Sequence, residues 1–150
     1  MRFITLIISI LIASPSHALF NSDSFRLAHT GTVHVQLNDD AKNGCWTNLR
    51  ETREYAEEKL RSKGAKLSSE IRYGAHDYLF EVGVIAYRTR GGCVAAISIK
   101  LTSFTFLPNL NDQKVYHIAE VGFSNRLISG YPKANEAVLD YVKEFIDNLK

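Results

Sequence analysis

The chain has little of several residue types that usually point to a function. Its 150 residues include only two cysteines, three prolines, one methionine and one tryptophan, and 18 basic residues nearly balance 16 acidic ones. A nucleic-acid-binding domain usually carries a clustered basic excess, and a helix that lies on a membrane surface carries a basic stripe. Neither pattern is present, so we expect no nucleic-acid partner and, after removal of the N-terminal segment, no membrane span.

Motifs for catalysis and metal binding are missing as well. No histidine spacing resembles H-E-x-x-H, no serine lies in a G-x-S-x-G elbow, and no glycine-rich phosphate loop precedes a helix. Glu81 and Glu120 are the strand carboxylates open to glycosidase chemistry, but an ion pair of Glu81 with Lys100 is the simpler interpretation. His76-Asp77 is interpreted as a turn. We therefore expect no catalytic residue, no metal ion and no cofactor, and an enzyme is the less favoured class.

The first 18 residues have the order of a secretory signal peptide, with one basic residue, a short apolar run and small residues up to Ala18. A membrane-spanning helix needs about 20 apolar residues, and this run is shorter and is interrupted by Pro15. We predict cleavage after Ala18 and an exported protein, periplasmic in a bacterial envelope or secreted. The mature chain, 19–150, is predicted to be a single domain whose first residues, 19–30, are poorly ordered.

Export places Cys45 and Cys93 in an oxidising compartment, where two cysteines pair by default. Redox-active pairs usually have C-x-x-C spacing, and structural zinc needs four ligands. The sequence therefore predicts a structural Cys45–Cys93 disulfide.

Hydrophobic periodicity predicts an α+β fold. The order of elements, β-α-β-β-β-β-α, implies an antiparallel sheet with two helices packed on one face. The predicted strands are 32–37, 66–72, 78–90, 93–106 and 115–127, and the predicted helices are 45–63 and 133–149.

Gly91-Gly92 lies between two strands and predicts a hairpin with a two-residue turn. This turn would pair Arg90 with Cys93. One face of the hairpin is then apolar, and Cys93 lies on that face, toward the first helix. The disulfide would in this way fix the start of the helix to the hairpin. The apolar set on the predicted buried face is Val82, Val84, Ala86, Ile97, Ile99 and Leu101.

The other face of the hairpin mixes apolar, aromatic and charged residues, which is typical of an interaction surface. Arg88 and Arg90, beside the hairpin tip, form a second candidate contact. The alternative is that the N-terminal segment or a second copy of the chain covers this face. The candidate binding residues are Ile85, Tyr87, Arg88, Arg90, Val94 and Lys100, with Leu79, Ala96, Phe104 and Phe106 on the same predicted face.

Three functional hypotheses follow. The leading one is an exported, non-enzymatic protein that binds another protein, of inhibitor, immunity or envelope-accessory type. The second is a cavity between helices and sheet, with His117 or Glu120 at its wall, that binds a small apolar ligand or acts as a cofactor-free enzyme. The third is a structural subunit that self-associates through an edge strand. The oligomeric state and the identity of the partner stay open. Bulky inward residues expected to fill any cavity are Trp46, Tyr78, Phe80, Tyr141 and Phe145.

Overall fold

The computed structural model describes residues 31–74, 76–108, 111 and 113–149. The predicted signal peptide, its cleavage after Ala18 and the segment 19–30 lie outside the described residues.

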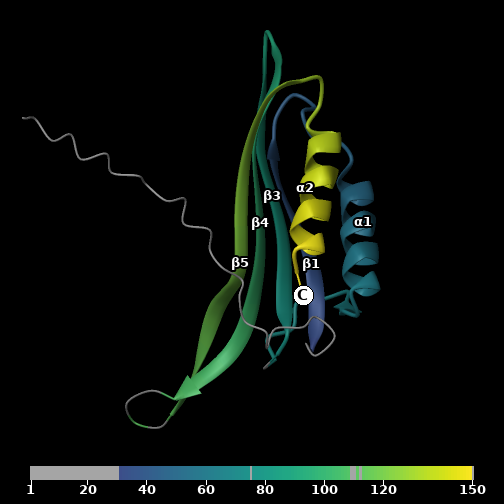
Figure 1. Ribbon diagram of the computed structural model, residues 1–150. Helices are drawn as coiled ribbons and strands as arrows, with labels where there is room; N and C mark the ends of the chain where they lie inside the picture. The colour runs from purple at the N-terminus through teal and green to yellow at the C-terminus, as the bar shows by residue number, and fades with distance from the viewer. Residues whose placement is uncertain (1–30, 75, 109–110, 112, 150) are drawn as a thin grey trace, which may run out of the picture.

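Five strands form one sheet, and two helices lie side by side against one of its faces (Figure 1). The α+β class and the predicted order of elements are confirmed. The elements are β1 (Thr32–Ala41), α1 (Leu49–Ser62), β2 (Lys66–Ser68), β3 (Tyr78–Thr89), β4 (Gly92–Pro108), β5 (Lys114–Tyr131) and α2 (Asn135–Asp147).

The sheet is mixed, with the strand order β2-β1-β3-β4-β5. β1 runs parallel to both β2 and β3, whereas β4 is antiparallel to both β3 and β5. Helix α1 is the crossover that makes β2 parallel to β1. β2 is only three residues long. The segment between β2 and β3 can therefore carry the chain back to the end of the sheet at which β1 and β2 begin. β3 begins at that same end and so runs parallel to β1. The sequence predicted a wholly antiparallel sheet and a second strand extending to residue 72.

Alternating side chains of the central strands form the core under the helices, as the sequence predicts. Phe80, Trp46, Tyr141 and Phe145 are buried in this core, while Tyr78 is only half-buried at its margin. Removing such large side chains from water is the main favourable contribution to folding, about 1.5–3 kcal/mol for each. The other buried residues of β3, β4 and the helices include Val82, Val84, Ile97, Ile99, Leu60, Val138, Val142 and Ile146.

The β3–β4 hairpin has a register two residues away from the predicted one. Arg88, not Arg90, pairs with Cys93, and Arg90-Gly91 form the turn between Thr89 and Gly92. The Thr89 hydroxyl donates a hydrogen bond to the Gly92 carbonyl (2.9 Å) and accepts one from the Gly91 amide (3.3 Å). A shift of two residues keeps every side chain on the same face. The predicted inward and outward sets are therefore correct although the predicted pairs are not.

Gly92 has a structural role that differs from the predicted turn position. Its φ is +118°, and a Cβ at this position would lie 2.8 Å from the carbonyl oxygen of Tyr131 on β5. Glycine is required here because β5 passes close to the start of β4.

The disulfide between Cys45 and Cys93 is confirmed, with the two Cα atoms 5.7 Å apart. Cys45 lies in the loop before α1, because the helix begins only at Leu49. The Cys45 carbonyl also accepts a hydrogen bond from the Ala134 amide at the start of α2 (2.7 Å). This corner of the molecule thus ties the loop, β4 and α2 together.

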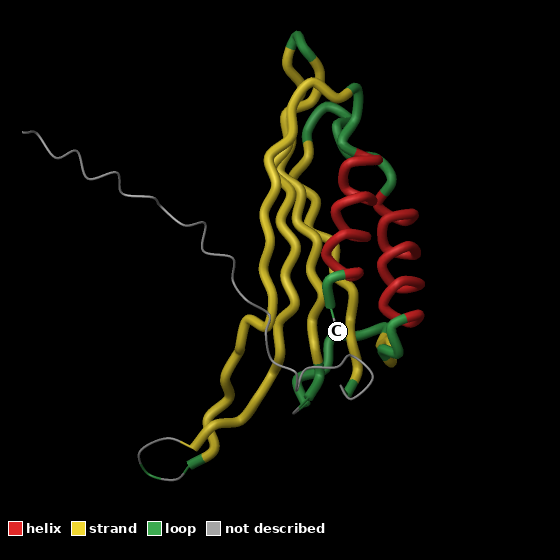
Figure 2. The backbone as a smooth tube through the Cα atoms, in the orientation of Figure 1, coloured by secondary structure: helices red, strands yellow, loops and turns green. Residues whose placement is uncertain are grey.

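β4 and β5 continue beyond the rest of the sheet as a two-stranded projection, here called the arm (residues 104–108 and 114–118). Past Ser103, β4 pairs only with β5, and the arm bends away from the helices (Figure 2). Phe104 is buried against the rings of Tyr73 and Tyr116, with centroid distances of 5.1 and 5.8 Å. The sequence placed Phe104 on the exposed face; it is buried because the segment before β3 brings Tyr73 over it. Phe106 stays exposed.

Candidate binding surface

The face of the sheet away from α1 and α2 is here called the open face. Its central part bears large, exposed apolar side chains on β3 and β5, with the smaller Val94 and Ala96 on β4 between them. The exposed fractions are 61% for Ile85, 55% for Tyr87, 41% for Phe123 and 77% for Leu127. Single exposed apolar residues are ordinary, but a group on neighbouring strands is the pattern that marks interaction sites.

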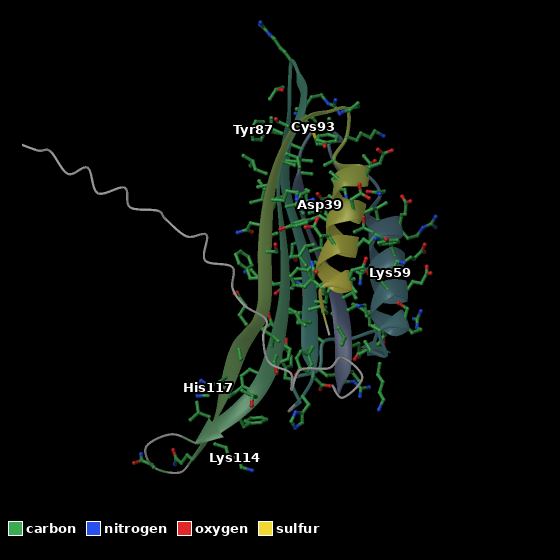
Figure 3. All side chains as sticks on the ribbon, viewed as in Figure 1. Asp39, Lys59, Tyr87, Cys93, Lys114 and His117 are labelled. Atoms are coloured by element: carbon green, nitrogen blue, oxygen red, sulfur yellow. A yellow bond between two sulfur atoms is a disulfide. The ribbon has the colours of Figure 1, made fainter. Side chains whose placement is uncertain are left out.

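Four of the predicted binding residues share the open face. Ile85 pairs with Ala96 and Tyr87 with Val94, so these side chains form a continuous row across β3 and β4. Lys100 lies further along β4, opposite Glu81. Figure 3 shows Tyr87 on the side of the sheet away from the helices.

The two arginines of the predicted set lie elsewhere. Arg88 has the opposite orientation to Tyr87 because successive strand residues alternate, and its Nε donates a hydrogen bond to the Asn43 carbonyl (3.2 Å). It lines a second depression, of about 440 Å³, together with Tyr131 and Lys133. Arg90 is exposed in the hairpin turn. The structure therefore divides the predicted residues between the open face, the turn and the opposite side.

A hollow of about 650 Å³ lies on the open face, lined by residues of β1, β3, β4 and β5. Small residues, Gly83, Ala96 and Ser98, occupy adjacent positions of β3 and β4 in its lining, and Ile85 and Leu127 are the large apolar ones. A Cβ on Gly83 would lie 2.7 Å from Ser98 Oγ, so a larger residue at position 83 would require the Ser98 hydroxyl to move. The hollow thus exists because small side chains lie between large ones.

Polar groups line the margin of the hollow. Asn38 and Asp40 on β1 contribute on one side and Asn125 on β5 on the other. The Asn38 side-chain amide donates a hydrogen bond to the Glu81 carboxylate (3.3 Å). The open face is therefore acidic and polar over β1, and its large apolar side chains lie on β3 and β5.

Glu81 and Lys100 are direct cross-strand neighbours, but each makes a different contact from the expected ion pair. Glu81 accepts the hydrogen bond from Asn38, and the Lys100 ammonium lies 5.6 Å from the centre of the Phe123 ring. A cation over an aromatic face is worth about 0.5–1 kcal/mol at an exposed site. Lys100 thus contributes its charge next to the apolar part of the face.

Phe123 and Leu127 are the surface residues that the sequence analysis missed. The strand containing them was predicted, but its pairing with β4 was not. The alternation of Phe123, Asn125 and Leu127 was the available signal. Its register could not be read because β5 contains two extra residues, Val121 and Gly130, at irregular positions of the pairing with β4.

Asp77 is part of a hydrogen-bonded turn before β3. Its carboxylate accepts hydrogen bonds from the Thr32 amide (2.9 Å), the Thr32 hydroxyl (2.7 Å) and the Gly74 amide (3.1 Å). Partial burial alone would raise the pKa of Asp77, but these hydrogen bonds stabilise the charged form and hold the pKa below its ordinary value. His76 has a φ of +77°, and its carbonyl oxygen accepts a hydrogen bond from the Gly31 amide (2.7 Å). These contacts are those of a turn that attaches the start of β1 to the start of β3.

Among the described residues, large side chains occupy the region between helices and sheet where the second hypothesis places a cavity. The space between helices and sheet is occupied by the buried aromatic residues of the core. His117 and Glu120, expected at a cavity wall, are exposed on β5 instead, and His117 lies on the arm away from the helices (Figure 3). Within the described part of the chain, no group of three or more His, Cys, Asp or Glu side chains is arranged to hold a metal ion. Neither described helix has the length and apolar character needed to cross a bilayer.

No protein-family model matches this chain, and no curated protein matches its sequence. Among solved structures, a dodecamer of a PelC point variant from Paraburkholderia phytofirmans is similar at 15% sequence identity, with a TM-score of 0.42. The similarity covers 85% of this chain and 91% of that chain. At this level it carries no argument about the partners or assembly of the present protein.

Proposed function

We propose that this protein is an exported, non-enzymatic binding protein that engages another protein through the hollow of its open face. The observation that carries the proposal is the hollow itself, of about 650 Å³, with Ile85 and Leu127 in its lining. Both side chains are more than half exposed, and their burial by a partner would recover hydrophobic free energy that folding leaves unused.

The distribution of polarity supports a protein partner. An apolar centre surrounded by polar groups is the usual anatomy of a protein interface. Asp40 on β1 and Glu81 on the neighbouring β3 give this side of the face negative charge. The small residues Gly83 and Ala96 let a partner approach the backbone closely. The face fits a segment with a bulky apolar side chain next to a basic residue. An inhibitor, an immunity protein and an envelope accessory protein would all use such a surface.

The disulfide supports the proposed compartment. Cys45 and Cys93 are both fully buried and paired, and such bonds persist in oxidising compartments such as the periplasm. The partner is then an exported protein as well.

The test uses a variant that fills the hollow without adding charge. Immobilised mature protein is exposed to envelope extract, and bound proteins are compared for wild type, Ala96→Phe and Glu58→Phe. Ala96 is exposed in the hollow, whereas Glu58 is exposed on α1, on the other side of the molecule. Both variants should fold, because neither position is buried.

We expect a defined protein to bind wild type and Glu58→Phe and to be lost from Ala96→Phe. The same protein should bind Ile85→Glu at least tenfold more weakly, since a charge replaces a side chain that the partner buries. Equal capture by wild type and Ala96→Phe, or no specific capture at all, would contradict the proposal.

A further inference from the structure

β5 is the edge strand of the sheet and is unusually long for that position. It spans 18 residues, whereas the strand at the opposite edge, β2, has three. Natural proteins usually protect edge strands by shortness, proline, lysine or bulges, because an open edge pairs readily with another chain. No strand within the described residues pairs with the outer side of β5.

The central segment of β5, residues 123–129, lacks these protections. It lies between the two irregular positions of the strand, Val121 and Gly130. It contains no proline and no lysine, and its one charged residue is Arg126. Arg126 lies on the helix side, where its guanidinium contacts the Glu144 carboxylate (2.6 Å) and lies over the Tyr141 ring (4.3 Å). Its charge is therefore already compensated within the chain.

We propose that two copies of this chain pair through the outer edges of their β5 strands, antiparallel, about a twofold axis at Asn125. The two sheets would join into one of ten strands, five from each copy. Such a contact is self-complementary, because both copies contribute the same segment. It is argued from the edge of the sheet and not from the partner proposed for the open face, although Leu127 also lines the hollow of that face.

The register follows from side chains and bulges. An antiparallel pairing about a twofold axis places one residue opposite its own copy. With Arg126 at the centre, two large guanidinium side chains would meet on the helix side, where each already occupies the space beside Glu144 and Tyr141. With Ser124 at the centre, Leu127 would face the irregular residue Val121, and centres further along the strand also bring an irregular position into the pairing.

With Asn125 at the centre, the pairing is regular over residues 122–128 and complementary, and the irregular residue Val121 meets only Ser129 at its end. Phe123 of each copy lies opposite Leu127 of the other on the open face. Arg126 lies opposite Ser124, a small residue that leaves room for the arginine and its contact with Glu144. Each dimer would therefore contain two Phe123–Leu127 contacts, one on each side of the twofold axis, in which these exposed side chains cover each other. An aromatic–aliphatic cross-strand pair is a favourable combination in sheets.

The size of the contact sets the expected strength. An edge contact of about seven residues per copy falls at the small end of specific protein interfaces, where complexes are transient. We therefore expect a dimer that dissociates on dilution.

Cysteine trapping tests the pairing directly. Asn125→Cys should form an intermolecular disulfide on mild oxidation, because a residue on the twofold axis meets its own copy. Asn38→Cys is the matched control: Asn38 is an exposed asparagine of the same face, but it lies on β1. We expect a covalent dimer for Asn125→Cys and a monomer for Asn38→Cys on a non-reducing gel. Equal cross-linking of both, or none of either, would overturn the proposal.

A mixing experiment tests the register. Phe123→Cys and Leu127→Cys proteins, differently tagged and mixed, should give mainly the mixed disulfide, because these positions face each other. A predominance of either homodimer would show a different register and would contradict the pairing about Asn125.

Sedimentation provides a second measurement that needs no cysteine. Wild type should show a concentration-dependent dimer, and Leu127→Arg should raise its dissociation constant by about tenfold, because the change occurs twice and removes two cross-strand pairs. Leu127 is mostly exposed, so this variant should fold. A wild-type protein that stays monomeric at all concentrations would reject the dimer. Ala96→Phe should leave the cross-link through Asn125→Cys intact while it abolishes partner capture, so the two proposals can fail separately.

Discussion

Cys45 and Cys93, 48 residues apart in the chain, form the covalent link between the loop before α1 and the start of β4. Pro132 and Ala134 also contact this pair, since Cys93 Sγ lies 3.5 Å from the Pro132 carbonyl and the Ala134 amide bonds to Cys45. Both cysteines are fully buried. The bond therefore anchors three segments of the chain at one end of the helical layer.

Removal of this disulfide should lower the free energy of unfolding by about 4 kcal/mol, from the loop entropy that the bond removes from the unfolded chain. The variant is Cys45→Ala with Cys93→Ala, and the measurement is urea unfolding followed by Trp46 fluorescence. Chemical reduction of the wild type should lower stability by a similar amount. A loss well under 1 kcal/mol in both experiments would contradict the anchoring role.

Asp77 should make stability depend on pH in the acid range. Its folded pKa lies below the ordinary value of 3.8, so its stabilising contribution is complete above that pH and is lost as pH falls through the folded pKa. Asp77→Asn should be less stable than wild type by about 1–2 kcal/mol at neutral pH, and the difference should shrink in acid. Unfolding curves across this pH range measure the effect.

Thr32→Val is the companion variant for Asp77. It removes the hydroxyl that donates to the carboxylate at 2.7 Å and leaves the backbone donors in place. An NMR titration of the Asp77 carboxyl carbon should then show a higher pKa than in wild type. An unchanged pKa would mean that the hydroxyl does not contribute to the shift.

Gly92→Ala should destabilise the protein by about 1–3 kcal/mol, because alanine at this φ is strained and its Cβ would meet the Tyr131 carbonyl oxygen at 2.8 Å. Gly91→Ala is the matched control, since a Cβ there would lie 4.0 Å from Thr89 Oγ1. We expect its effect to be smaller than that of Gly92→Ala. Equal midpoints of thermal unfolding for the two variants would contradict the observed turn.

Phe104→Ala should loosen the arm without unfolding the domain. Phe104 is buried against Tyr73 and Tyr116 but is not part of the cluster under the helices. Hydrogen exchange should therefore increase in the arm and change little in the central strands. Phe106→Ala should have a smaller effect, because that side chain is already 46% exposed. Uniform acceleration throughout the protein would show that the arm and the core form one cooperative unit.

Several features of this fold could be predicted because they depend on local pattern. Alternation along residues 78–101 identified which side chains face the helices, and helical spacing identified α1 and α2, although both helices are shorter than predicted. The cysteine pairing followed from the count. Four of the six predicted binding residues share the open face for the same reason, since parity along a strand decides the face.

Other features depend on segments far apart in the sequence. Alternation along a strand cannot distinguish registers that differ by two residues, so the sequence placed the turn at Gly91-Gly92. In the structure, Gly92 pairs with Thr89, and its lack of a side chain lets Tyr131 approach. The direction of β1 relative to β3 depends on the short β2 and the return of the chain through residues 69–77. Phe104 is buried by Tyr116 of β5 and by Tyr73, which lies outside the strands.

Sequence alone therefore determined the α+β class, the disulfide and the two faces of the hairpin, because each follows from side-chain period or residue count. The tertiary structure decided the mixed sheet, the hairpin register and the position of β5 at the open edge. It also placed Leu127 of β5 and Ile85 of β3 on the two sides of Ala96 in the lining of one hollow. Those outcomes depend on the order of the strands and on the irregular positions Val121 and Gly130. Packing between distant segments sets both, and neither leaves a periodic signal along the chain.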